Sequence, residues 1–138
     1  ANGYVVVMLK VLPDEKELLS AEMVRIADEH EAELILTTGG TGFSERDCMP
    51  EATCEIAERM VPGIPEAMRA YSSRFTKRAM LSRAVACIRK QSLIINLPGS
   101  PKAVRECLEY MLTEITHGIE ILTGEASDCA GETSKWEQ

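Results

Sequence analysis

A glycine-rich turn lies between an apolar run and the start of a helix, an arrangement typical of phosphate-binding sites. Residues 34–36 are apolar and branched, and Gly39, Gly40 and Gly42 follow them. Glycine adopts positive φ and has no side chain, so the backbone can approach a ligand closely and offer N–H groups to an anion. Pro50 suits the first position of the following helix, whose free N–H groups also favour negative charge. The pattern predicts a site for a phosphate group.

Two aspartates near this turn are candidate ligands for a metal ion. Asp47 precedes the helix of Pro50, and Asp14 opens the acidic first turn of an earlier predicted helix. Mg²⁺ binds carboxylates together with substrate phosphates, so the pair could hold Mg²⁺ beside a nucleotide. Each aspartate also has a structural interpretation, because Asp47 is placed to cap a helix and an acid in a first turn stabilises the helix dipole. Spacing alone favours the cap for Asp47.

The order of the predicted elements places these residues on one rim of a sheet. Residues 4–12 are a nearly unbroken β-branched run, as expected for a strand covered on both faces, and a helix from Asp14 to about His30 leads to the strand at residue 34. A right-handed crossover makes the two strands parallel, so their ends face the same way. Ligands of open α/β sheets bind at that edge.

The second half of the chain repeats the strand-to-helix arrangement. A short helix is expected at residues 66–75, and residues 84–89 and 92–97 are predicted as two strands joined by a tight connection. Ser100 then caps a long helix that begins at Pro101, with Gly118 as a point of interruption. From residue 124 the chain is small and polar. We therefore expect a single domain over residues 1–123 and a flexible tail over 124–138.

Composition argues against several classes of partner. A chain of 138 residues with 45% apolar content suffices for one domain with a core. The net charge of −7 and the pI near 4.9 disfavour a general binder of nucleic acids or of anionic membranes. The sequence has no apolar run of about 18 residues and no secretory leader, so we expect a cytosolic protein. Its five cysteines show no paired spacing and are expected to be reduced thiols.

Three motifs in order resemble the molybdopterin adenylyltransferase family, which includes the N-terminal domain of gephyrin. The first is Thr-Thr-Gly-Gly-Thr-Gly at residues 37–42, followed by Arg46-Asp47 and by Pro-Glu-Ala-Thr at residues 50–53. The second is Asn-Leu-Pro-Gly-Ser-Pro-Lys-Ala-Val at residues 96–104, and the third is Leu-Pro-Asp-Glu at residues 12–15. The resemblance implies a three-layer α/β sandwich in which a mostly parallel central sheet is flanked by helices.

This resemblance also implies an activity. The family transfers AMP from ATP to the terminal phosphate of molybdopterin and releases pyrophosphate, which prepares the pterin for molybdenum insertion. Such a transfer needs in-line positioning, a metal ion and hydrogen-bond donors, and no Ser-His-Asp or Cys-His set for covalent catalysis is visible here. We expect ATP and molybdopterin as substrates, Mg²⁺ as cofactor, a homotrimer, and a partner for molybdenum insertion. The alternative is a non-catalytic molybdopterin-binding or assembly protein of the same fold.

The motif positions imply a role for each candidate residue. Asp14 and Asp47 are the expected catalytic pair and Mg²⁺ ligands. The residues expected to bind nucleotide or pterin are Thr38, Gly39, Gly40, Thr41, Gly42, Ser82, Asn96, Pro98, Gly99, Ser100 and Lys102. The first five cradle the nucleotide, and those from Asn96 onward shape the pterin and phosphate side, with Lys102 as a cation. The structural alternatives are a plain turn for the glycines and a capped helix with a solvated lysine for the second loop. Ser82 and Arg83 are weaker candidates for the same pocket, because an arginine at a strand start is usually a surface residue.

The chain departs from the family pattern in two places. Family members begin with another strand, a Ser-Asp-Arg element and a glycine-bearing loop, for which this sequence has no counterpart. That strand would lie in the middle of the sheet, so we expect the chain to be a piece of a longer protein, with which a free N-terminal piece could pair. Met49 stands where the family usually has threonine. Loss of that hydroxyl removes a cap and a phosphate contact, which predicts reduced activity.

Overall fold

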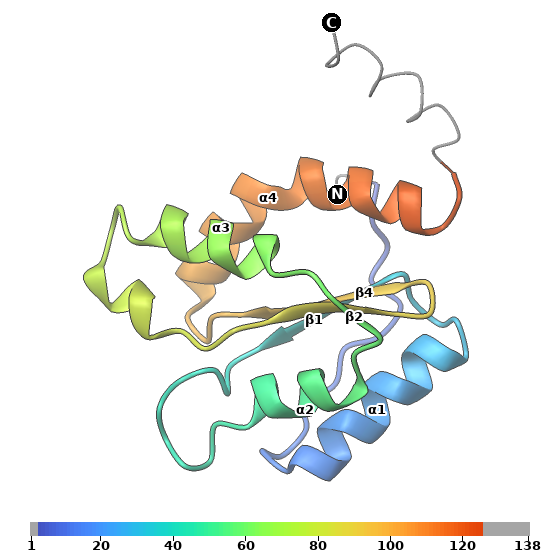
Figure 1. Cartoon of the computed structure of the whole chain (residues 1–138), viewed down its shortest axis with the longest axis horizontal. Helices are drawn as coiled ribbons and strands as arrows, with labels where there is room; N and C mark the ends of the chain where they lie inside the picture. Colours follow the sequence, from blue (N-terminus) through green and yellow to red (C-terminus); the bar gives the residue numbers. More distant parts are fainter. Residues whose placement is uncertain (1–2, 126–138) are drawn as a thin grey trace, which may run out of the picture.

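The computed structural model describes residues 3–125 of the chain. The helices are α1 (Lys16–Asp28), α2 (Met49–Ile56), α3 (Gly63–Ser72) and α4 (Pro101–Leu122), with a short 3₁₀ helix η1 (Lys77–Leu81). The strands are β1 (Leu34–Thr38), β2 (Arg59–Met60), β3 (Ala86–Arg89) and β4 (Ser92–Leu97). Helices α1 and α2 cover one face of the sheet, and α3 and α4 cover the other (Figure 1). The expected three-layer α/β sandwich is confirmed; most of the expected tail, from residue 126 on, lies outside the described residues.

Strand β4 is the centre of the molecule, and all of its residues are buried. Successive side chains of a strand point to opposite faces, so one strand contributes to both cores. Ile94 packs with α1 and α2, whereas Leu93, Ile95 and Leu97 pack beneath α3 and α4. Asn96 has the same parity as Ile94, which places its polar side chain in the layer of α2.

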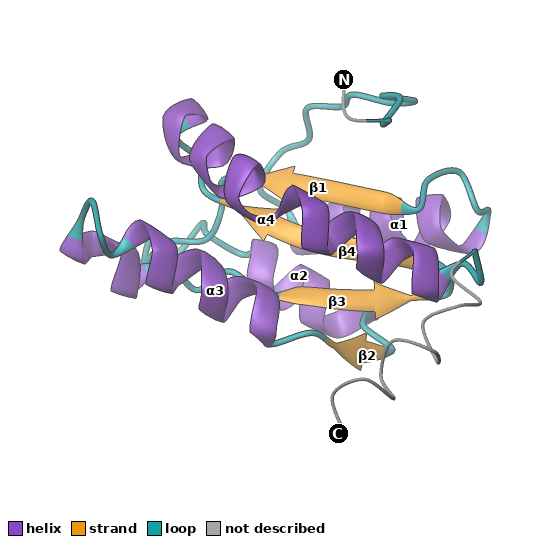
Figure 2. Ribbon diagram, turned by 90° about the horizontal axis from the view of Figure 1, so that it is seen from above, coloured by secondary structure: helices purple, strands orange, loops and turns teal. Residues whose placement is uncertain are grey.

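The sheet has the order β1-β4-β3-β2, with β1 parallel to β4 and with antiparallel pairs β4–β3 and β3–β2. Figure 2 shows the arrows of β1 and β4 pointing the same way. Within residues 3–125 the sheet is therefore mixed, not mostly parallel as expected. The carboxyl ends of β1 and β4 meet in register at Thr38 and Leu97. Both predicted ligand loops consequently leave the sheet at one edge.

Residues 4–12 correct an expectation, because this apolar run forms no strand. Val5, Leu9 and Val11 are 83%, 90% and 96% exposed. The segment is held by side chains, with a 2.7 Å hydrogen bond between Tyr4 Oη and Thr116 Oγ1 of α4 and further contacts to α1. Among the described residues no backbone pairs with it, and β1 pairs only with β4. A β-branched run becomes a strand only beside another strand, so the predicted parallel partner of β1 was wrong.

Most of the remaining local predictions hold with shifted boundaries. The two predicted strands form the β3–β4 hairpin, in which Lys90 adopts φ of 52°. Helix α3 begins at Gly63, earlier than expected, because Pro65 then lies in the first turn, where its missing N–H costs nothing. Ser100 caps α4 by accepting a 3.4 Å hydrogen bond from the Ala103 N–H. Gly118 does not interrupt that helix. Across the described part of the chain, none of the helices combines the length and apolar character needed to span a membrane.

Candidate functional site

The two strand-to-helix loops touch at the carboxyl edge of the sheet. The Gly39 N–H donates to the Leu97 carbonyl at 3.3 Å, and a Cβ placed on Gly99 would lie 3.6 Å from the Gly39 Cα. Gly39 and Gly40 have φ of +81° and +71°, which side chains rarely permit. The close approach of two backbones explains why this edge is glycine-rich.

Both predicted aspartates lie beside the glycines of the loop of residues 40–47, the glycine loop. A Cβ on Gly40 would lie 3.8 Å from Asp14 Oδ1, and a Cβ on Gly42 would lie only 2.8 Å from Asp47 Oδ2. Gly42 has no positive φ, so the need for glycine there comes from the carboxylate beside it. A side chain at residue 42 would displace Asp47.

Neither aspartate caps a helix. The N-cap of α2 is Cys48, without a side-chain hydrogen bond, and that of α1 is Glu15. Asp47 Oδ2 instead accepts a 3.0 Å hydrogen bond from the Ser44 N–H and closes the loop. The interpretation of Asp47 as a helix cap was therefore wrong.

An acidic environment surrounds Cys48. Burial, followed by the negative charges of Asp14, Glu51, Glu17 and Asp47, raises the pKa of the Cys48 thiol. The carboxylates of Asp14 and Asp47 therefore both lie close enough to act on this thiol, and their negative charge disfavours the thiolate.

The glycine loop has its carbonyl oxygens turned inward. The Gly40 carbonyl accepts from the Met49 N–H at 3.1 Å, and the Thr41 carbonyl accepts from the Arg83 N–H at 2.9 Å. The Gly42 carbonyl accepts from Arg83 Nε at 2.7 Å. In a planar trans peptide, the N–H points away from the preceding C=O, so the next three N–H groups, those of residues 41–43, face outward. Within residues 3–125 these N–H groups have no hydrogen-bond acceptor, and adjacent free N–H groups of this kind form an anion site.

A hollow of about 420 Å³ opens beside this loop. Its lining includes Thr41, Gly42, Ser82 and Pro98 from the predicted set, together with Arg78. Another hollow, of about 490 Å³, lies between α3 and α4 and is lined by apolar residues such as Ile64 and Met111. It contains no residue of either loop, so the first hollow is the candidate site.

Residues 1–118 match the family described as "Probable molybdopterin binding domain". The chain belongs to this family. Molybdopterin adenylyltransferases of Helicobacter pylori strain J99 and Escherichia coli K12 are 43% and 47% identical to it over 115 and 114 residues. These matches cover 83% and 80% of the chain but only 65% and 58% of the two relatives. A crystal structure of the molybdopterin biosynthesis enzyme MoaB from Thermus thermophilus is also similar, with a TM-score of 0.75 and 47% identity, covering 81% of this chain and 70% of that one.

Most candidate residues lie around the two loops, but their environments differ. Thr41 is buried in the loop, and Thr38 is exposed at the end of β1. Ser100 uses its hydroxyl as the cap of α4. The Lys102 side chain is 87% exposed, with Glu106 4.0 Å away. The Lys102 side chain is therefore largely in solvent.

Asn96 lies beneath the two loops. Its side chain is fully buried, and its amide nitrogen donates to Thr37 Oγ1 and to Thr53 Oγ1, both at 3.0 Å. Its amide oxygen accepts from the Val85 N–H at 3.2 Å. Asn96 thus joins β1, β4 and α2 and shapes the site from below.

Two arginines near the site are more closely involved with the loops than their sequence positions indicate. Arg83 makes side-chain contacts to the loop, and Arg69 donates to the carbonyls of Ser82 and Ala84 at 3.3 and 3.0 Å. A signal was present in the sequence, because residues 67–105 contain nine lysines and arginines and no aspartate or glutamate. This basic segment supplies most of the wall of the hollow.

Proposed function

We propose that this domain transfers AMP from ATP to the terminal phosphate of molybdopterin. A phosphate oxygen of molybdopterin forms a bond to the α-phosphorus of ATP. The bond between the α-phosphorus and the α,β-bridging oxygen breaks, and pyrophosphate leaves with that oxygen. The observation that carries the proposal is the meeting of the glycine loop, the Gly99 loop and Asp14 at one edge. The names of the two curated relatives support it.

The residues of the site suit the binding of two phosphate-bearing substrates. The outward N–H groups of residues 41–43 suit phosphate oxygens, and the hollow beside Ser82 and Pro98 suits the flat pterin. Lys102 supplies a cation at the rim. Donors fixed before the substrate arrives stabilise charge that develops at phosphorus, so the protein needs no covalent nucleophile.

Asp14 and Asp47 are the residues that would hold Mg²⁺. Among residues 3–125, no group of three or more histidines, cysteines, aspartates or glutamates could hold a metal ion. Two carboxylates nevertheless fit Mg²⁺, which usually keeps several waters and is completed by substrate phosphates. When bound, Mg²⁺ stabilises negative charge on the phosphate oxygens.

The direct test is incubation of the protein with ATP, Mg²⁺ and molybdopterin, followed by chromatography for adenylylated pterin and pyrophosphate. We expect both products. Absence of both, under conditions in which the Escherichia coli relative is active, would reject the proposal. Tight binding of molybdopterin without pyrophosphate release would select the alternative, a non-catalytic binding or assembly protein.

The resemblance also leads us to propose a homotrimer in the cytoplasm that passes its product to a molybdenum-inserting protein. The chain mass is 15.2 kDa, and sedimentation equilibrium should give three times that value. A monomer at assay concentrations would contradict the trimer without affecting the proposed chemistry.

A further inference from the structure

Arg83 contacts the glycine loop through both its main chain and its side chain. Arg83 Nε donates to the Gly42 carbonyl at 2.7 Å, and Nη2 donates to the Asp47 carbonyl at 2.8 Å. Nη1 donates to Glu51 Oε2 in the first turn of α2 at 2.6 Å. The main-chain N–H of the same residue donates to the Thr41 carbonyl at 2.9 Å. Arg83 therefore contacts the beginning and the end of the loop and the helix that follows it.

These contacts decide which way the loop peptides face. Two of the three inward carbonyls, those of Thr41 and Gly42, are held by Arg83. Peptide planarity then turns the N–H groups of Gly42 and Phe43 outward. Glycine has unusually wide backbone freedom, so without these contacts the same peptides could rotate and present carbonyl oxygens, which repel an anion.

We propose that Arg83 is a positioning residue that holds the loop of residues 40–47 in its anion-binding conformation before the phosphate group arrives. The inference deepens the proposed function and rests on it for the identity of the anion. A loop that is already ordered loses less conformational entropy when the anion binds, so the affinity for the anion is higher. The role needs a planar fork with several donors in fixed directions, which lysine cannot supply although it carries the same charge.

The chain offers a matched control at the other end of β3. Arg89 Nε donates to Asp28 Oδ1 at 2.9 Å, and Arg89 Nη1 donates to the Ile56 carbonyl at 3.0 Å. Like Arg83, it joins a carboxylate and a main-chain carbonyl, but it contacts neither loop. Arg83→Lys and Arg89→Lys therefore remove the same kind of contact and leave the net charge unchanged.

The experiment measures binding of inorganic pyrophosphate by calorimetry and hydrogen exchange of the loop amides in the ligand-free protein. We expect Arg83→Lys to weaken pyrophosphate binding about tenfold and Arg89→Lys to change it less than about twofold. Exchange at the Ser44, Asp47 and Met49 amides, which are hydrogen-bonded within the loop, should accelerate only in Arg83→Lys.

Two results would overturn the proposal. The first is unchanged pyrophosphate affinity in Arg83→Lys, which would show that binding needs the positive charge at most and not the planar guanidinium. The second is an equal loss in both variants, which would reflect general destabilisation. If Arg83→Lys fails to fold, Glu51→Gln replaces it, because that variant weakens one contact of the same guanidinium. We expect a smaller loss of pyrophosphate affinity and a smaller acceleration of loop exchange. Wild-type affinity and wild-type loop exchange in Glu51→Gln would also refute the role. Neither readout needs turnover, so failure of adenylyl transfer would remove the proposed function and leave this inference standing.

Discussion

At the scale of single residues, the charge of Asp47 can be removed without removing its hydrogen bond. Its Oδ2 accepts the Ser44 N–H, and an asparagine oxygen can accept the same hydrogen bond. We therefore expect Asp47→Asn to keep the loop closed and to lower turnover at least about tenfold, a loss of about 1.4 kcal/mol in transition-state stabilisation. Steady-state kinetics provide the measurement. Turnover at the wild-type rate would leave Asp47 with the loop-closing role alone.

Asn96 should affect stability rather than turnover, because its side chain is fully buried and hydrogen-bonded within the protein. Asn96→Ala would leave the Val85 N–H without its partner and open a cavity between β4 and α2. We expect a loss of about 2–4 kcal/mol in the free energy of unfolding, measured by denaturant titration. Ser92→Ala is the control on the same buried strand, because it removes one hydrogen bond, to the Ala32 carbonyl, and should cost about 1 kcal/mol. Similar losses in the two variants would contradict the linking role of Asn96.

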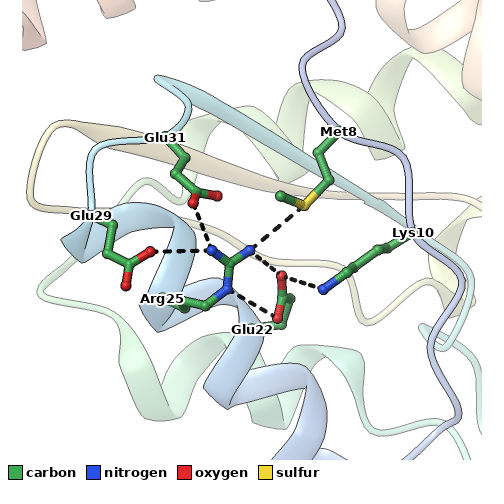
Figure 3. A network of polar contacts seen from close by, with 6 residues as sticks. All are labelled: Met8, Lys10, Glu22, Arg25, Glu29 and Glu31. Atoms are coloured by element: carbon green, nitrogen blue, oxygen red, sulfur yellow. Dashed lines mark hydrogen bonds and ion pairs between the residues drawn. The ribbon is translucent and has the colours of Figure 1, made fainter.

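At the scale of elements, a polar network joins the unpaired N-terminal segment to α1 (Figure 3). Arg25 Nη2 donates to Glu22 Oε1 at 2.6 Å and contacts the Met8 sulfur at 3.8 Å. Lys10 Nζ donates to the same Glu22 oxygen at 3.0 Å. Glu29 and Glu31 complete the cluster around Arg25. Side chains thus hold a segment that has no strand partner among the described residues.

This network predicts a pH dependence. Hydrogen bonds from Arg25 and then Lys10 lower the pKa of Glu22 from 4.5 to about 2. A lowered folded-state pKa stabilises the fold above the unfolded value, and this contribution is lost as the pH falls from 4.5 towards 2. Glu22→Gln should therefore reduce the free energy of unfolding by about 1 kcal/mol at neutral pH, the upper range for partly exposed pairs. Denaturant unfolding at several pH values should show the difference shrinking only in that acid window; a constant difference would exclude the ion pair as its cause.

At the scale of the whole molecule, charge is segregated along the chain. The net charge is −7, yet residues 67–105 carry nine basic residues and no acidic ones. Two of these residues, Arg69 and Arg78, line the candidate hollow. The wall of the hollow therefore carries a charge opposite in sign to the net charge of the protein.

The local field can be tested with two substitutions that change the net charge equally. Arg78 lines the hollow, whereas Arg59 of β2 pairs with Ile88 away from both loops. Near physiological salt, the Debye length is about 8 Å, so only close charges should act. We expect Arg78→Gln to weaken pyrophosphate binding about threefold or more and Arg59→Gln to leave it within about 1.5-fold. Equal losses by calorimetry would show that net charge governs binding.

Local chemistry explains the parts of the structure that could be predicted from the sequence. The glycine turn, the Ser100 cap and the β3–β4 hairpin each depend on residues close together in the chain, so their patterns were sufficient. The resemblance of three motifs then indicated the family. The lack of a strand at residues 4–12 was not predictable in this way, because strand formation requires a neighbour that composition does not specify.

The sequence by itself determined the α/β class, the two ligand loops and the family. Only the tertiary structure decided that Asp47 closes a loop, that Asn96 is buried, and that Arg83 holds the loop. The physical reason is sequence separation: Arg83 and Gly42 are 41 residues apart, and Asn96 and Thr53 are 43 apart. Such contacts depend on how the strands are ordered in the sheet, which brings distant residues together at one edge.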